Sequence, residues 1–93
     1  MKPFKWNHRK NQWLMGARDV SFEEIVYYIQ NGGLLDSLEH PNRESYPGQK
    51  LFEVKTHSYC YLVPYVEEEE FYFLQTVIPD RKVKRKHEKK SKT

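Results

Sequence analysis

The residues of this sequence that are best suited to chemistry are basic and stand at its C-terminal end. Eight of the last thirteen residues are Lys or Arg, against one acidic residue, Glu88. A cluster of this density forms an electrostatic footprint for phosphate groups, although such a run can also be a solvated tail. Arg81 and Arg85 favour the phosphate interpretation, because a planar guanidinium donates two parallel hydrogen bonds to a phosphate.

Histidine is the one residue type here whose ordinary pKa lies near neutrality. His87 lies inside the basic cluster, where neighbouring cations favour its neutral form and so a role as a base, but it could also be a tail residue without a role. We expect His8, His40 and His57 to be structural or solvent-facing. The histidine spacing matches no metal-ligand motif, so we predict no metal site.

Two other chemically suggestive features have simpler explanations. Cys60 stands in an alternating strand pattern and is predicted to be a core residue. A single cysteine also excludes a disulfide within the chain and a zinc module of several cysteines. Residues 67–70 are four consecutive glutamates, which could mimic phosphate or bind calcium. They lack the spacing of a calcium loop, so we predict a solvated turn.

The formal net charge of +3 conceals a strong asymmetry along the chain. Residues 1–20 carry five basic side chains and one acidic side chain. Residues 21–80 carry three basic and eleven acidic side chains, and residues 81–93 carry eight basic side chains and one acidic side chain. Basic ends around an acidic middle indicate a polyanionic partner, or a partner chain of opposite charge.

Ninety-three residues allow a single domain, residues 1–93, of which about 89–93 are expected to form a frayed tail. Fourteen residues are aromatic, whereas disordered chains are poor in such residues, so a small aromatic core is expected. No apolar run is long enough to span a membrane and no export signal is recognisable, which predicts a cytoplasmic protein.

The elements that must position the basic residues begin with a strand and a helix. Phe4–Trp6 alternates apolar and polar residues and is predicted to be a short edge strand. Asn7 is a favoured N-cap, which predicts a helix through about Leu14 or Met15 that stops near Gly16. In this helix Arg9 and Lys10 are expected to lie partly opposite Trp13 and Leu14.

A second helix is predicted over residues 21–30. Residues 21–24, Ser-Phe-Glu-Glu, form a capping box, and apolar residues follow with the spacing of a single helical stripe. The Asn-Gly-Gly sequence at 31–33 is expected to end the helix, because glycine tolerates the left-handed conformation there.

The remainder of the chain reads as β structure. Residues 34–48 predict a short strand followed by a long polar loop. Three segments with a period of two, at about 51–56, 59–64 and 71–76, predict an antiparallel meander with the helices on one face. Arg81 would follow directly on a last strand that reaches Ile78, and residues 80–88 form either a short helix or a loop. The predicted fold class is α+β, with two N-terminal helices packed on a three- to four-stranded antiparallel sheet and a short basic C-terminal segment.

Three short motifs resemble those of a known family. They are Phe4-x-Trp6-Asn7-x-x-Lys10-Asn11, Val20-Ser21-Phe22-Glu23-Glu24, and Ile78-Pro79-Asp80-Arg81-Lys82-Val83. In order and spacing they resemble the signatures of the BrnT-like toxins, members of the RelE/ParE-like group of type II toxin–antitoxin ribonucleases. The resemblance covers about residues 4–88 and implies a RelE-like fold.

The sequence departs from the family pattern in three places. The family's Lys-His-Gly is replaced by Ala17-Arg18-Asp19, its acidic residue after the tryptophan is Asn7, and a family arginine corresponds to Lys50. These departures indicate a diverged subgroup and bear more on the active-site chemistry than on the fold.

The resemblance implies a cytoplasmic endoribonuclease that cleaves mRNA without a metal or other cofactor and inhibits translation. The resemblance and the charge pattern together point to Arg81, Lys82 and His87 as the catalytic group, with Arg81 on the scissile phosphate and His87 as base or acid. The expected RNA-binding residues are Arg85, Lys84, Lys50, Arg18, Arg9 and Lys10. An exposed tyrosine, such as Tyr46 or Tyr59, could stack on an unpaired base.

The family resemblance also implies a cognate antitoxin of the ribbon-helix-helix type, which would form a hetero-oligomer with this chain. Two alternatives remain open at this point. One is a module of the same fold that binds an antitoxin or nucleic acid without cleavage. The other is a plain RNA- or DNA-binding domain that uses its basic tail.

Overall fold

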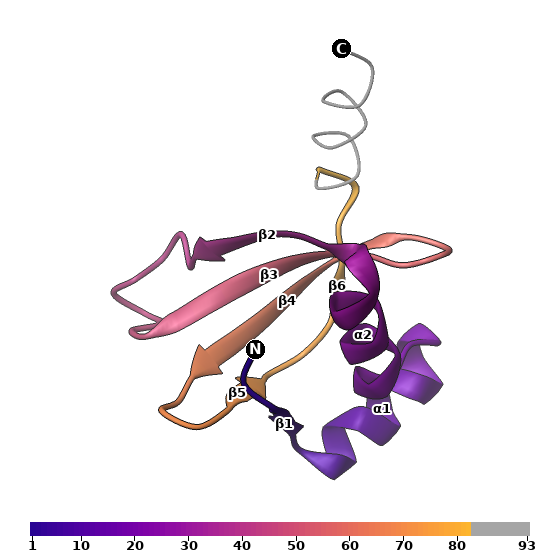
Figure 1. Ribbon diagram of the computed structural model, residues 1–93, viewed down its shortest axis with the longest axis horizontal. Coiled ribbons are helices and arrows are strands. Elements are labelled where there is room, and N and C mark those ends of the chain that lie inside the picture. Colours follow the sequence, from indigo (N-terminus) through magenta and orange to yellow (C-terminus); the bar gives the residue numbers. More distant parts are fainter. Residues whose placement is uncertain (83–93) are drawn as a thin grey trace.

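The computed structural model describes residues 1–82, which form a curved mixed sheet with two helices (Figure 1). In chain order the elements are β1 (Phe4–Trp6), α1 (His8–Arg18), α2 (Phe22–Tyr28), a widened turn η1 (Ile29–Gly33), β2 (Leu34–Glu39), β3 (Gln49–Lys55), β4 (Cys60–Glu67), β5 (Tyr72–Leu74) and β6 (Ile78–Pro79). The predicted α+β class is therefore confirmed.

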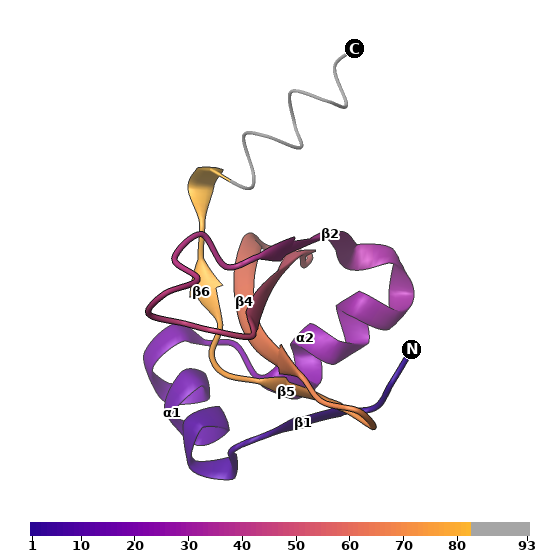
Figure 2. The same ribbon diagram turned by 90° about the vertical axis from the view of Figure 1, so that its left-hand side faces the viewer.

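The strands follow the order β1-β5-β4-β3-β2, and β6 pairs with β4. β5 pairs with the end of β4 and β6 with its beginning, so both lie along the same edge of β4 (Figure 2). All pairings are antiparallel except that of β1 with β5. The prediction of three to four antiparallel strands is wrong in number, because β1 joins the sheet in parallel and the two-residue β6 is too short to show a period of two.

The core lies between the helices and one face of β3 and β4. Phe52 and Val54 of β3 and Val63 of β4 are at most 2% exposed, as are Leu14 of α1 and Ile25 of α2. Alternate residues of a strand point to the same face, so these side chains form one layer against the helices. The prediction that the helices pack on one face is confirmed by this single core.

Helix α2 begins as the sequence predicts. The Ser21 hydroxyl accepts a hydrogen bond from the backbone N–H of Glu24 at 3.0 Å, as expected of an N-cap. The helix ends at Tyr28, two residues before the predicted end, and η1 follows. A Cβ at Gly33 would lie 2.5 Å from the Lys55 carbonyl oxygen, so this turn requires glycine to approach β3.

Helix α1 begins at the predicted cap but does not stop near Gly16. The Asn7 side chain accepts a hydrogen bond from the backbone N–H of Lys10 at 3.0 Å. The helix continues through Gly16 to Arg18, and Asp19 takes up the left-handed conformation with φ of 53°. A glycine in a helix costs only about 1 kcal/mol relative to alanine, which packing of the helix readily offsets.

The predicted continuous strand up to Ile78 is broken. β5 ends at Leu74, and β6 is a separate strand beyond the buried Val77. The chain nevertheless stays bonded to β4, because the Asp80 N–H donates to the Cys60 carbonyl at 3.1 Å. Arg81 therefore follows a segment anchored to the sheet, though not the strand that the sequence predicted. Most of the predicted 80–88 segment and the whole predicted tail lie outside the described residues.

The short connections agree with the sequence, with one exception. The β3–β4 hairpin closes with a hydrogen bond from the Thr56 N–H to the Tyr59 carbonyl at 2.8 Å, and Cys60 is buried as predicted. The exception is Glu67, which belongs to β4 rather than to the turn over 68–71. Within residues 1–82, no helix has the length and apolar character needed to cross a membrane.

Candidate nucleic-acid interface

The exposed side of α1 carries an aromatic ring between basic side chains. Trp13 is 47% exposed. The Lys10 Nζ lies 4.2 Å from the centroid of its ring, and the Arg18 Cζ lies 5.0 Å from it. We call Arg9, Lys10, Trp13 and Arg18 the α1 platform. A cation over an exposed tryptophan contributes about 0.5–1 kcal/mol, enough to orient a side chain and too little to hold it there permanently.

Helix geometry explains how Lys10 comes to lie on Trp13, because residues three apart share a helical face. Arg18, in the last turn, makes a second contact, since its Nη1 donates to the Val77 carbonyl at 2.5 Å. Val77 lies between β5 and β6. Arg18 therefore connects α1 to the segment that leads to Arg81.

All three charged side chains of the α1 platform, those of Arg9, Lys10 and Arg18, are positive. Helix α1 contains no acidic residue. Within residues 1–82 the two ion pairs both lie elsewhere, so no carboxylate pairs with Arg9, Lys10 or Arg18. The charges of these three side chains are therefore free to meet a phosphate.

A buried amide holds α1 against α2. Asn11 is 3% exposed, and its Oδ1 accepts a hydrogen bond from the Phe22 N–H at 2.7 Å. Its Nδ2 donates to Glu23 Oε1 at 2.5 Å. Since Asn11 joins the first turns of α2 to the middle of α1, it fixes the orientation of the helix that carries the platform.

The predicted catalytic residues are described only in part. Arg81 and Lys82 are exposed and open a helical turn after β6. The Lys82 N–H donates to Asp80 Oδ1 at 2.7 Å, which caps this turn. The predicted residues His87, Arg85 and Lys84 lie outside the described residues.

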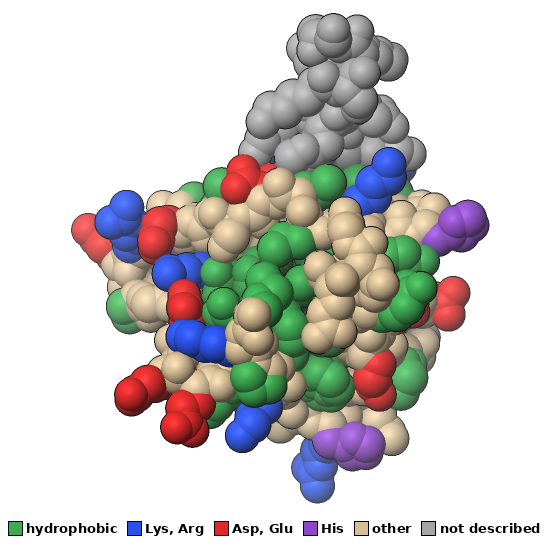
Figure 3. Space-filling model, in the orientation of Figure 1, with side chains coloured by type: hydrophobic (Ala, Val, Ile, Leu, Met, Phe, Trp, Pro, Cys, Tyr) green, Lys and Arg blue, Asp and Glu red, His purple; other side chains and the backbone are tan. Residues whose placement is uncertain are grey.

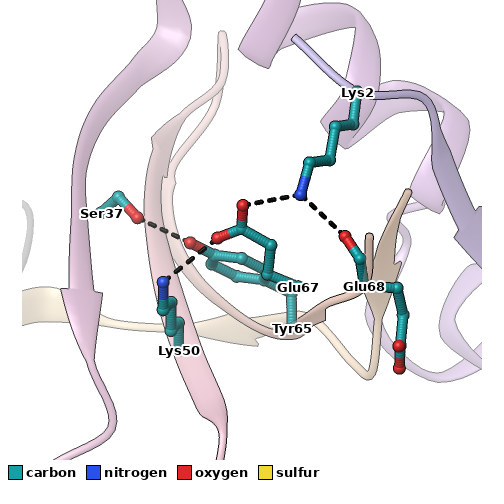
Figure 4. A network of polar contacts seen from close by, with 6 residues as sticks. All are labelled: Lys2, Ser37, Lys50, Tyr65, Glu67 and Glu68. Atoms are coloured by element: carbon teal, nitrogen blue, oxygen red, sulfur yellow. Dashed lines mark hydrogen bonds and ion pairs between the residues drawn. The ribbon is translucent and has the colours of Figure 1, made fainter. Parts of the chain in front are cut away.

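Lys50, predicted to bind RNA, belongs to a different cluster (Figure 4). Its Nζ lies 3.1 Å from Glu67 Oε1, and the Nζ of Lys2 lies 2.9 Å from Glu67 Oε2. Lys2 also donates to the Glu68 carbonyl at 2.7 Å. We call Lys2, Lys50 and Glu67 the Glu67 network.

The Glu67 network shifts the pKa of its members in opposite directions. Hydrogen bonds from Lys2 and then Lys50 hold the pKa of Glu67 below its ordinary value. The hydrogen bond to Glu67, followed by its charge, raises the pKa of Lys50. The charge of Lys50 is thus partly compensated by the carboxylate that it shares with Lys2, unlike the charges on α1. Figure 3 shows acidic and basic side chains interleaved on this side of the molecule.

Tyr65 lies beside this network but is not an accessible acid. It is 2% exposed, and its ring stacks on Phe52 with centroids 3.7 Å apart. Its hydroxyl is 2.7 Å from the Ser37 Oγ, and burial raises the pKa of the phenol.

The two tyrosines predicted to stack on bases differ in exposure. Tyr46 is 48% exposed and lies against His40, while Tyr59 packs partly buried against the core.

The three histidines among residues 1–82 make no contact that indicates a catalytic role. His8 lies 3.2 Å from the Gln12 amide, and the His40 Nδ1 accepts a hydrogen bond from the Asn42 N–H at 3.0 Å. His57 is exposed in the β3–β4 hairpin. In the described part of the chain, no three His, Cys, Asp or Glu side chains are grouped so that they could hold a metal ion.

Trp13 is the residue of this interface that the sequence interpretation missed. The sequence predicts Trp13 on the side of Leu14, partly opposite Lys10, whereas in the structure Leu14 is fully buried and Trp13 lies exposed beside Lys10. The spacing of Lys10 and Trp13, three residues apart in a predicted helix, was the available signal.

No protein-family model matches this chain, and no curated protein or solved structure was found to be similar to it.

Proposed function

We propose that this chain is a BrnT-like, RelE-like endoribonuclease, the toxin of a type II toxin–antitoxin system, which cleaves mRNA and so inhibits translation. The observation that carries the proposal is the link between the two basic ends of the chain. Arg18 of the α1 platform is hydrogen-bonded to Val77, four residues before Arg81. Cations interleaved with an exposed aromatic ring are a common surface for single-stranded nucleic acid.

In the proposed reaction a base takes the proton of a ribose 2′-hydroxyl, and that oxygen attacks the adjacent phosphorus. The bond to the 5′-oxygen breaks, and a second group protonates the leaving oxygen. The products are a 2′,3′-cyclic phosphate end and a 5′-hydroxyl end. Arg81 binds the scissile phosphate and stabilises its developing charge, with Lys82 beside it.

The other predicted residues take supporting roles in this proposal. His87 supplies the base or the acid, and Lys84 and Arg85 bind the RNA backbone beyond the scissile phosphate. Lys50 binds RNA less strongly than the α1 cations, because Glu67 competes for its ammonium.

A cognate antitoxin is part of the proposal. An acidic segment of a ribbon-helix-helix antitoxin would cover the basic surface that includes residues 81–92 and screen it from RNA. The two chains would form a hetero-oligomer. Co-expression with the product of the adjacent gene should yield a complex that survives affinity purification at moderate salt, and failure to co-purify would count against this partner.

Induction of the chain in growing bacterial cells tests the function. The wild type should arrest growth and deplete mRNA, and Arg81→Ala should abolish both effects with an unchanged circular dichroism spectrum. Arg43→Ala is the matched control, because it removes an exposed arginine in the loop between β2 and β3. Normal growth and intact mRNA after induction of the wild type would refute the ribonuclease. Toxicity of Arg81→Ala equal to that of the wild type would refute the placement of the site.

A further inference from the structure

Trp13 is a large aromatic side chain that the fold leaves outside its core. The neighbouring Leu14 is 0% exposed, whereas 47% of Trp13 remains exposed although two cations approach its ring. Met15 is equally exposed but lies two positions further along, on a different side of the helix. Trp13 and Met15 therefore form no continuous apolar stripe of the kind that a partner helix requires.

The chemistry around Trp13 fits an unpaired nucleobase with its phosphates. A base needs one aromatic face to stack on, and each flanking phosphate needs a cation. The Lys10 ammonium over the exposed ring is held weakly and can leave the ring for a phosphate. Arg18 is held in place by the Val77 carbonyl and keeps its remaining donors for a second phosphate.

The α1 platform is also within reach of the proposed phosphate site. Val77 and Arg81 are four residues apart, and four residues span at most about 14 Å even when fully extended. A single RNA strand can therefore contact Trp13 and Arg81 together.

We propose that the α1 platform is a subsite for single-stranded RNA, in which one unpaired base stacks on Trp13 while Lys10 and Arg18 bind the adjacent phosphates. This inference rests on the proposed function, which supplies RNA as the substrate. The α1 platform would hold a part of the RNA that lies away from the scissile bond. The platform sets affinity and the placing of the strand, and it takes no part in bond breaking.

Tryptophan fluorescence tests the subsite separately from cleavage. In a Trp6→Phe background Trp13 is the one remaining tryptophan, since the chain has two. The probe is a mixed-sequence RNA oligonucleotide with 2′-O-methyl groups throughout, which cannot undergo the proposed attack. We expect saturable quenching of Trp13 by this RNA. Heparin, a polyanion without bases, should bind but leave the emission nearly unchanged.

The affinity of variants is then measured by fluorescence anisotropy of a labelled form of the same RNA. Trp13→Leu should weaken binding about 5- to 140-fold, the range that corresponds to loss of one base stack. Tyr27→Leu is the matched control, because Tyr27 is an exposed aromatic residue of α2, and it should bind as the wild type does.

The subsite is refuted if RNA does not quench Trp13, if heparin quenches it equally, or if Trp13→Leu binds with wild-type affinity. Quenching by the antitoxin chain but not by RNA would also refute it and make the α1 platform a protein interface. Quenching and the Trp13→Leu loss in a chain that leaves unmodified RNA intact would uphold the subsite and refute only the cleavage. Cleavage by Trp13→Leu with an unchanged KM would refute the subsite alone.

Discussion

The α1 platform and the Glu67 network each gather basic side chains, but they treat the positive charge differently. On α1 the partner of Lys10 and Arg18 is the Trp13 ring, which orients the cations without cancelling their charge. In the Glu67 network one carboxylate bridges Lys2 and Lys50 and compensates one of their two charges. The local partner of a lysine, rather than the number of lysines, therefore decides which surface is available to a polyanion.

The two regions also differ in what they contribute to the fold. The Glu67 network connects the N-terminal Lys2 to the start of β3 and the end of β4, so its charged groups pair with one another (Figure 4). Within residues 1–82, the side chains of the α1 platform make one hydrogen bond to the remainder of the fold, from Arg18 to Val77. The platform is oriented mainly by the buried Asn11 beneath it. Its charges therefore remain available to a ligand.

The largest expected effect comes from removing the support of α1. Asn11→Ala leaves the buried Phe22 N–H without its acceptor and should lower the free energy of unfolding by about 1–3 kcal/mol. Urea denaturation followed by circular dichroism measures this loss. Gln12→Ala, an exposed change on the same helix, should shift the value by at most about 0.5 kcal/mol. Equal stability of both variants would mean that Asn11 does not fix α1.

A moderate effect is expected from converting the Glu67 network into a second platform. Glu67→Gln releases Lys2 and Lys50 for phosphate contact. For single strands the logarithm of affinity should then fall more steeply with the logarithm of salt, by about 0.7 for each lysine that gains a phosphate. Glu69→Gln is the matched control, since it removes the same charge from the adjacent turn without releasing an ion-paired lysine. Equal slopes for the two variants would contradict the contrast between the regions.

The smallest expected effect is a pH dependence confined to the Glu67 network. The pKa of Glu67 is lowered from its ordinary value of 4.5 by the two lysines, so at acidic pH this carboxyl group binds fewer protons in the folded state than in the unfolded state. Its stabilising contribution is complete above pH 4.5 and is lost as the pH falls through the lower folded pKa. The stability difference between the wild type and Glu67→Gln should therefore shrink below pH 4.5 in urea titrations. A difference that stays constant from pH 7 to pH 3 would refute this role of Glu67.

The sequence predicts the elements whose signals are local. Ser21 caps α2 as its motif indicates, and the alternating segments of β3 and β4 show their strands directly. The parallel pairing of β1 with β5 was not visible, because it joins residues almost seventy positions apart through two very short strands. The continuation of α1 through Gly16 was missed because packing overrides the weak helix propensity of a single glycine.

The candidate site shows the same division. The basic residues of α1 and the position of Arg81 next to the sheet could be recognised from composition and order. The pairing of Lys50 with Glu67 depends on the register of β3 against β4, and no pattern within a single strand reports it. The exposure of Trp13 depends on which side of α1 meets the core, and a helix with two neighbouring apolar residues leaves that choice open.

The most direct test of the proposed function is to map RNA ends in cells that express this chain. We expect new mRNA fragments with 2′,3′-cyclic phosphate and 5′-hydroxyl ends in cells with the wild type or Arg43→Ala, and none above background with Arg81→Ala. The absence of such ends with the wild type, or their equal abundance with Arg81→Ala, would contradict the proposed cleavage of mRNA at a site that contains Arg81.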